Sequence, residues 1–357
     1  MEKIITKGIF FIVLAIFALS FRKSIDNNKE PLGIDTTKEL KGLAIAAVLI
    51  GHMAIVFQLI EIPVTMYLGA QAVEIFLFLS AFGLMCSFNK NGLHKFIRKR
   101  VLVIFIPYMV FIIIRTIVLS LVGQTIGVGN FIAELFALKV TTDPSMWYIQ
   151  YIIIWYIIFF IVFSIKSLSQ NQKAFTLLFI GTIFYGISVY IWSNQIVIKN
   201  PLSESISHHV AFPLGAVFYL YYDKFKNLSN QKYLIVSVLS GVVYAISSAL
   251  IPNIFPYYIA NISFIVLLVS LLMLLTKNGY KSKLLLKLGD MSYYIYLNEM
   301  GVMVLVISTL KPSPMAVLAI ILISILVAIP IKFISDLILK VIKRTFPSTN
   351  ANQVEIL

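Results

Sequence analysis

The sequence has very few cysteines and few charges, and each shortage excludes a class of protein. Cys86 is the one cysteine, so the chain can form no internal disulfide and no cysteine-based metal site. The four histidines show no spacing typical of metal ligands, and we expect no metal. Only 12% of the residues are charged, about half the ~25% of a soluble domain. No segment has the composition of a soluble domain.

Hydrophobic residues make up 60% of the chain, and the mean hydropathy is +0.94. These values predict an all-α polytopic membrane protein. About 20 apolar residues are needed to cross a bilayer. Eleven segments approach this length: Ile4–Phe21, Gly42–Ile60, Tyr67–Phe88, Val101–Val122, Trp147–Ile165, Ala174–Ser193, Ser207–Tyr222, Tyr233–Ile251, Ile254–Thr276, Leu288–Leu310 and Met315–Val341. The loop segment FIAELFAL is expected to form a short interfacial or re-entrant helix.

The net charge of +14 need not indicate a nucleic-acid partner, because basic residues flank membrane helices on the cytoplasmic side. Of the 29 Lys and Arg residues, 22 lie in alternate loops and five in the remaining ones. This alternation predicts a multi-pass protein of the cell membrane with its C-terminus in the cytoplasm and its N-terminus outside. Met1–Phe21 also has features of a signal peptide. That orientation would place the basic loop Arg22–Lys41 outside, so we favour an uncleaved helix.

The hairpin Thr37–Cys86 carries an ionisable residue in each apolar arm, namely His52 and Glu74. If the hairpin folds at its midpoint, between Pro63 and Val64, His52 lies opposite position 75. The two side chains are then at nearly the same depth. Ionisable groups inside a membrane usually mark a functional site. The alternative is a buried polar pair that only holds two helices together.

Other polar residues extend this candidate site. Glu299 lies eleven residues after Leu288, at about the depth of His52, and Arg115 lies within another span. Lys38 and Lys41 share one helix face, with His52 about 16 Å further along. Basic residues at the cytoplasmic end of the helix and a base deep in the membrane suit a long anionic donor. Arg98 and Arg100 would also bind the phosphates of this donor. The alternative for these basic residues is simple topology anchoring.

An ordered set of motifs resembles the acyltransferase-3 family of integral membrane acyltransferases. The first is Lys38-x-x-Lys41 with His52 ten residues on, where the family has R-x-x-R. The second is the run from Gly69 to Phe82, with Glu74 and Ser80-Ala81-Phe82 close to the family's V-D and S-G-F. The others are Pro107-Tyr108 after a basic loop, Ser145-Met-Trp147-Tyr148-Ile149, and Leu288-Gly-x-x-Ser292-Tyr-x-x-Tyr296-Leu-Asn-Glu299. The departures are the two lysines for arginines, Ala81 for glycine, and Ser145 and Glu299 for histidines.

The resemblance implies a ten-helix core at residues 36–345, preceded by an added helix and loop at 1–35 and followed by a tail at 346–357. It implies an enzyme that moves an acyl group, usually acetyl, from cytoplasmic acyl-CoA to a hydroxyl of a cell-envelope glycan or lipid-linked sugar. His52 would be the general base or acyl acceptor, and Glu74 would hold its imidazole. Lys38, Lys41, Arg98 and Arg100 would bind the donor. A possible polar centre comprises Arg115, Trp147, Ser292, Tyr296 and Glu299.

The competing function is a transporter or flippase for an envelope glycan, which also requires many helices and polar residues at the midplane. Such carriers often show inverted repeats and broken helices. The sequence shows neither feature convincingly, so the acyltransferase interpretation is favoured.

Overall fold

The computed structural model describes residues 12, 15–24, 30–57, 63–139, 143–194, 208–251 and 254–345. Nearly all of them are helical. The long helices are α2 (Ile34–Val56), α3 (Pro63–Asn91), α4 (Phe96–Leu121), α6 (Trp147–Ser164), α7 (Gln170–Ser193), α10 (Asn230–Ala249), α11 (Ile254–Lys277), α12 (Lys283–Thr309) and α13 (Pro314–Thr345). Shorter elements are α5 (Val128–Leu135), α9 (Ala211–Lys226), the 3-10 turn η1 (Pro144–Met146), and strands β1 (Arg22–Lys23) and β2 (Tyr280–Lys281), which pair antiparallel.

Nine helices of the described residues are long and apolar enough to cross a membrane. The predicted class, an all-α polytopic membrane protein, is confirmed. The predicted span Ser207–Tyr222 corresponds to α9, whose 16 residues fall short of the about 20 that a spanning helix needs. The predicted span Ile4–Phe21 lies mostly outside the described residues, as does the tail at 346–357.

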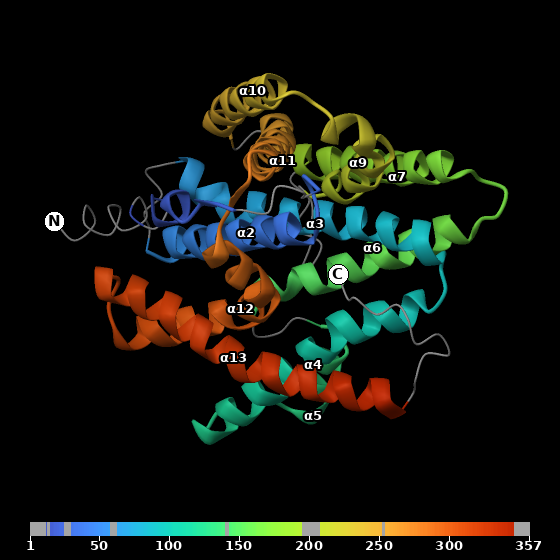
Figure 1. Ribbon diagram of the computed structural model, residues 1–357. Helices are drawn as coiled ribbons and strands as arrows, with labels where there is room; N and C mark the ends of the chain where they lie inside the picture. The colour runs from blue at the N-terminus through green and yellow to red at the C-terminus, as the bar shows by residue number, and fades with distance from the viewer. Residues whose placement is uncertain are drawn as a thin grey trace.

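Helix α2 lies at the centre of the protein, between α3 and α12, and packs extensively on both (Figure 1). Two glycines set the distance between α2 and α12. A Cβ on Gly42 would collide with the carbonyl of Leu285, and a Cβ on Gly289 would collide with the carbonyl of Lys38. The close approach of these backbones is therefore possible only because both residues lack a side chain.

A second glycine pair sets the register of α2 against α3. The backbone of Gly51 packs on that of Gly69, so a Cβ at position 51 would collide with the nitrogen of Gly69. Position 51 of α2 is thus level with position 69 of α3. A hairpin folded at its midpoint would instead place position 51 opposite a residue several positions further along α3.

Helix α5 is the short helix predicted around FIAELFAL, and two contacts fix it against α4. The Tyr108 hydroxyl donates to the backbone carbonyl of Glu134 at 2.7 Å, and the Arg115 guanidinium forms an ion pair with the Glu134 carboxylate. The Gln150 amide of α6 donates to the carbonyl of Ala137, just after α5, at 2.8 Å. These contacts hold α5 and the residues after it against α4 and α6.

Candidate active site

Two histidine–carboxylate pairs lie among the central helices. In the first, Nδ1 of His52 on α2 is 2.6 Å from Oε1 of Glu299 on α12. His52 lies ten residues beyond Gly42, and Glu299 lies ten residues beyond Gly289. The two helices meet at those glycines. An equal helical rise from there brings the two side chains to the same level. The prediction that Glu299 lies at the depth of His52 is confirmed.

The predicted pairing of His52 with Glu74 is wrong. Oε1 of Glu74 accepts hydrogen bonds from Nδ1 of His208 at 2.7 Å and from the Asn261 amide at 2.6 Å. Gly69 of α3 is level with Gly51, the residue before His52. Glu74 lies five residues beyond Gly69, so it is about 7.5 Å of helical rise away from that level. The packing of Gly51 on Gly69 sets the register of α2 against α3. The assumption that the hairpin folds at its midpoint therefore predicted the wrong level for Glu74.

The two pairs differ in their access to other molecules. The His52 side chain is 21% exposed over a fully buried Glu299, whereas the side chains of His208 and Glu74 are each 2% exposed. The Trp147 ring covers His208, stacked at 4.9 Å between centroids with 22° between the planes. The His52 side chain is therefore partly exposed, while His208 is enclosed by protein.

The remaining residues of the predicted polar centre divide among several places. Glu299 joins His52 and Trp147 joins His208, as described above. Arg115 pairs with Glu134. The Tyr296 hydroxyl donates to the Ser145 carbonyl, and the Ser292 hydroxyl donates within α12 to the Gly289 carbonyl at 2.8 Å. Ser292 therefore stabilises its own helix, whereas Tyr296 ties α12 to the turn before α6.

Asp143 is a candidate that the sequence reasoning missed. It lies in the turn before α6, is 6% exposed, and accepts hydrogen bonds at Oδ1 from the Ser145 amide at 2.9 Å and hydroxyl at 2.6 Å. Its charge interacts with those of Arg115 and His52. Burial raises the pKa of the Asp143 carboxyl, while the hydrogen bonds from Ser145 and the charge of Arg115 act against this rise. Its one sequence signal was its place shortly before the Trp147 motif.

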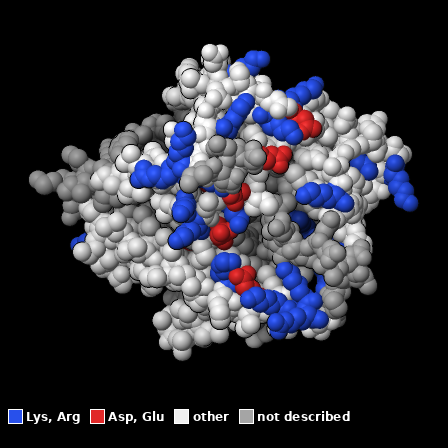
Figure 2. Space-filling model, in the orientation of Figure 1, with Lys and Arg blue, Asp and Glu red and all other residues white. Residues whose placement is uncertain are grey.

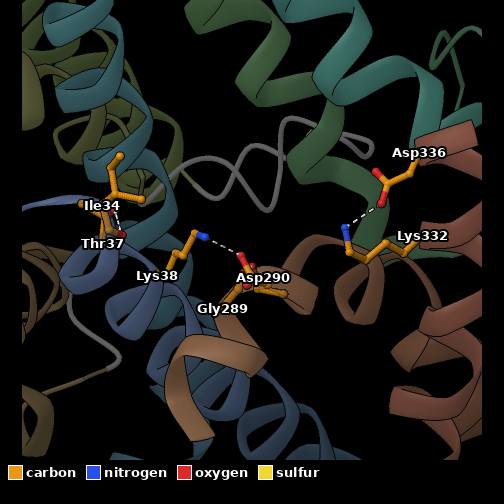
Figure 3. A network of polar contacts seen from close by, with 8 residues as sticks. Ile34, Thr37, Lys38, Gly289, Asp290, Lys332 and Asp336 are labelled. Atoms are coloured by element: carbon orange, nitrogen blue, oxygen red, sulfur yellow. Dashed lines mark hydrogen bonds and ion pairs between the residues drawn. The ribbon is translucent and has the colours of Figure 1, made fainter. Parts of the chain in front are cut away.

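Three of the four predicted donor-binding residues lie toward the N-terminal end of α2. Lys38 forms an ion pair of 2.9 Å with Asp290 of α12, as Figure 3 shows. Lys41 lies within electrostatic range of Lys38, Arg100 and Asp290. We call Lys38, Lys41 and Arg100 the basic cluster. Figure 2 shows several groups of Lys and Arg with few acids among them on the face in view.

Arg100 keeps part of its hydrogen-bonding capacity unused. Its guanidinium carbon lies 5.8 Å from the centre of the Tyr156 ring, and its buried Nε has no hydrogen-bond partner among the described residues. Arg98 lies two positions away on the same helix, so it points to a different side of α4. The structure thus brings three of the four predicted donor-binding residues together.

Cofactor and metal binding would use different side chains. The basic cluster could hold an anionic cofactor through its charges. In the part of the chain that the structure describes, no three His, Cys, Asp or Glu side chains gather as metal ligands.

A comparison with protein-family models gives a match over most of the chain. The family model of the acyltransferase-3 group, described as an acyltransferase domain, matches residues 39–333, which is most of the chain. Neither a curated protein nor a solved structure matches the chain significantly.

Proposed function

The chain belongs to the acyltransferase-3 family, and we propose that this membrane acyltransferase carries an acetyl group from acetyl-CoA to a hydroxyl of an envelope glycan or lipid-linked sugar. Its identity as an acyltransferase comes from the family match over residues 39–333. The donor, the acyl chain and the acceptor are our proposal. The proposal rests on one observation. The His52–Glu299 pair, in which the His52 side chain is partly exposed, lies near one end of α2, and the basic cluster lies near the other end.

The donor phosphates would bind at the basic cluster, because CoA is anionic and both Lys and Arg bind phosphate groups. Lys41 precedes His52 by eleven residues, about 16 Å along α2. A ligand held by its phosphates at the cluster therefore needs a long flexible arm to present its thioester at His52. The pantetheine arm of CoA fits this requirement.

At His52, the transfer would proceed by general base catalysis. Glu299 holds Nδ1, which leaves Nε2 to take the proton of the acceptor hydroxyl. The hydroxyl oxygen attacks the thioester carbon, a C–O bond forms, the C–S bond breaks, and the proton passes from Nε2 to the leaving thiolate. If His52 instead accepts the acyl group itself, Nε2 attacks the thioester carbon, an N–C bond forms, and the C–S bond breaks to release the CoA thiolate. The acceptor hydroxyl then attacks the same carbon, the N–C bond breaks to free Nε2, and the hydroxyl proton passes to the thiolate.

Glu74 takes a different role from the one expected. It lies in the enclosed pair with His208 rather than beside His52. Glu299 therefore replaces it as the group that holds the imidazole. Glu74 would position α3 against α11 and the turn before α9 through its bonds to Asn261 and His208.

The experiment that tests the function uses purified protein in detergent with labelled acetyl-CoA. Glycan extracted from the source cells serves as acceptor. We expect CoA release that depends on the acceptor and label that appears in the glycan as an ester. CoA release without labelled glycan would argue against a glycan acceptor, and no release at all would argue against acetyl-CoA as donor.

A further inference from the structure

One acid lies against the basic cluster. Nζ of Lys38 on α2 is 2.9 Å from Oδ1 of Asp290 on α12, and Figure 3 shows the two side chains pointing toward each other. The main charges that act on Lys41 are those of Lys38 and Arg100, which repel it, and that of Asp290, which attracts it. One carboxylate therefore offsets the charge of a group of cations at the place where we expect the donor phosphates.

The crossing of α2 and α12 fixes the position of Asp290. Gly289 packs its backbone on the Lys38 carbonyl, at a place where a Cβ would collide. Asp290 is the next residue of α12, and its side chain meets the side chain of Lys38. The ion pair therefore follows from the same helix crossing that levels His52 with Glu299.

Both members of the ion pair are open to a ligand. The Lys38 side chain is 38% exposed, and the Asp290 side chain is 49% exposed. An exposed ion pair contributes little to the free energy of folding, so a competing anion can open this one at low cost. A phosphate that binds Lys38 must displace the Asp290 carboxylate or lie beside it, and two anions that share one lysine repel each other.

We propose that Asp290 is a specificity-determining residue of the donor site, which occupies Lys38 and so competes with the donor phosphates. Lys41 and Arg100 then supply most of the attraction, and Lys38 adds little until the ion pair opens. This inference rests on the proposed function, because it takes the donor to be an acyl-CoA whose phosphates bind at the basic cluster. Asp290 lowers the affinity for acetyl-CoA and for the product CoA by the same factor, since both carry the same phosphates.

This role has two consequences for the donor. The repulsion from Asp290 grows with the negative charge of the ligand, so it weakens the binding of CoA more than that of dephospho-CoA, which has fewer phosphate groups. Weakening the substrate and the product equally leaves the chemical step unchanged. It also speeds the release of CoA, and product release limits turnover in many enzymes.

The first test measures CoA binding to the purified protein in detergent by calorimetry, at a fixed low ionic strength. An exposed ion pair is worth a factor of about two to five in an equilibrium constant. We expect Asp290→Asn to bind CoA about two- to fivefold more tightly than the wild type, with a smaller gain for dephospho-CoA. Asp290→Glu keeps the charge and should bind CoA as the wild type does.

The ion pair between Lys332 and Asp336 on α13 provides a matched control, and Figure 3 shows both pairs. Its length is also 2.9 Å, and its side chains are 36% and 44% exposed, close to the values for Lys38 and Asp290. The main charges that act on Lys41 include neither member of this pair. Asp336→Asn should therefore leave the affinity for CoA unchanged.

A double-mutant cycle tests how Asp290 acts. The free-energy gain from Asp290→Asn should fall by roughly half or more in a Lys38→Gln background, because the carboxylate then has no lysine to occupy. Lys38→Gln alone should weaken CoA binding less than Lys41→Gln does. In transfer assays, Asp290→Asn should lower the KM for acetyl-CoA and the inhibition constant of CoA by the same factor, with no rise in kcat.

The outcomes separate the two proposals. A wild type that does not bind CoA overturns the donor assignment and this inference with it. A wild type that binds CoA and transfers no acetyl group overturns the proposed function, and the binding data then decide the role of Asp290. Three results overturn this inference alone: unchanged or weaker CoA binding by Asp290→Asn, an equal gain from Asp336→Asn, or an equal gain from Asp290→Asn in the Lys38→Gln background.

Discussion

Nδ1 of His52 lies 2.6 Å from Oε1 of Glu299, although the two residues are 247 positions apart in the chain. This contact places a carboxylate on Nδ1 of an imidazole whose other nitrogen, Nε2, has no hydrogen-bond partner among the described residues. A fully buried carboxylate in this position fixes the ring orientation and the tautomer. The pair is the centre of the proposed reaction.

Replacing His52 should remove catalysis and spare donor binding. We expect His52→Ala to lower acceptor-dependent CoA release by roughly 10²–10⁴-fold, the usual contribution of a general base. Acetyl-CoA should still bind, because the basic cluster is about 16 Å away. His94→Ala, an exposed histidine in the loop before α4, is the control. Near-normal turnover of His52→Ala would remove it from the mechanism.

Replacing Glu299 should lower catalysis, whereas replacing Glu74 should not. Glu299→Gln should lower kcat by roughly 10²–10⁴-fold with little change in either KM, because an amide facing Nδ1 no longer selects the reactive tautomer. Glu299→Asp should restore part of the activity. The measurement is steady-state kinetics with both substrates varied. If Gln and Asp at position 299 reduced kcat equally, Glu299 would act by packing rather than by orienting His52.

Glu74→Gln should act mainly on stability. It removes one member of an enclosed pair, and breaking such a pair typically costs about 3–5 kcal/mol. We expect a lower midpoint in thermal unfolding in detergent, with kcat of the folded fraction nearer to wild type than that of Glu299→Gln. A kcat loss as large as that of Glu299→Gln, without loss of stability, would return Glu74 to the reacting site.

The basic cluster should govern donor affinity. Lys41→Gln together with Arg100→Gln should raise the KM for acetyl-CoA about tenfold or more, because hydrogen bonds to charged groups are worth about 1.5–3 kcal/mol each. The acceptor dependence should not change. Lys166→Gln, an exposed change in the loop after α6, serves as control. An unchanged acetyl-CoA KM would leave these residues as topology anchors.

The glycine contact between α2 and α12 should be needed for activity. Gly289→Ala places a methyl group against the Lys38 carbonyl, and such overpacking typically costs about 1–3 kcal/mol. We expect lower thermal stability and lower kcat, since the same contact levels His52 with Glu299. Gly301→Ala on the same helix has no atom within 4 Å of its new Cβ, so it should be neutral or slightly stabilising. Equal behaviour of the two variants would contradict this account.

The membrane orientation can be tested by cysteine labelling in a Cys86→Ser background. Gln124→Cys lies in the loop between α4 and α5, and Lys166→Cys lies in the loop after α6, both exposed. A membrane-impermeant maleimide applied to intact cells should label Gln124→Cys and not Lys166→Cys, because the basic loops are expected in the cytoplasm. The reverse pattern would place the basic cluster outside and remove the route for cytoplasmic acyl-CoA.

The sequence by itself determined the class of this protein. Long apolar runs can satisfy their backbone hydrogen bonds in lipid only as helices, so composition alone predicts an all-α membrane protein. It also predicted nine spans that the structure contains, and it identified His52 and Glu299 as residues of equal depth. Depth along a helix follows from residue number at 1.5 Å per residue, so local information is sufficient for it.

Only the tertiary structure decided which side chains meet. Glu74 pairs with His208 because Gly51 packs on Gly69, and Glu299 meets His52 because Gly42 and Gly289 let α2 and α12 approach. The turn that carries Asp143 is tied to α12 by the hydrogen bond from Tyr296 to the Ser145 carbonyl, although nothing periodic marks Asp143 in the sequence. Partner choice depends on helix rotation and crossing points, which are set by contacts between segments far apart in the chain.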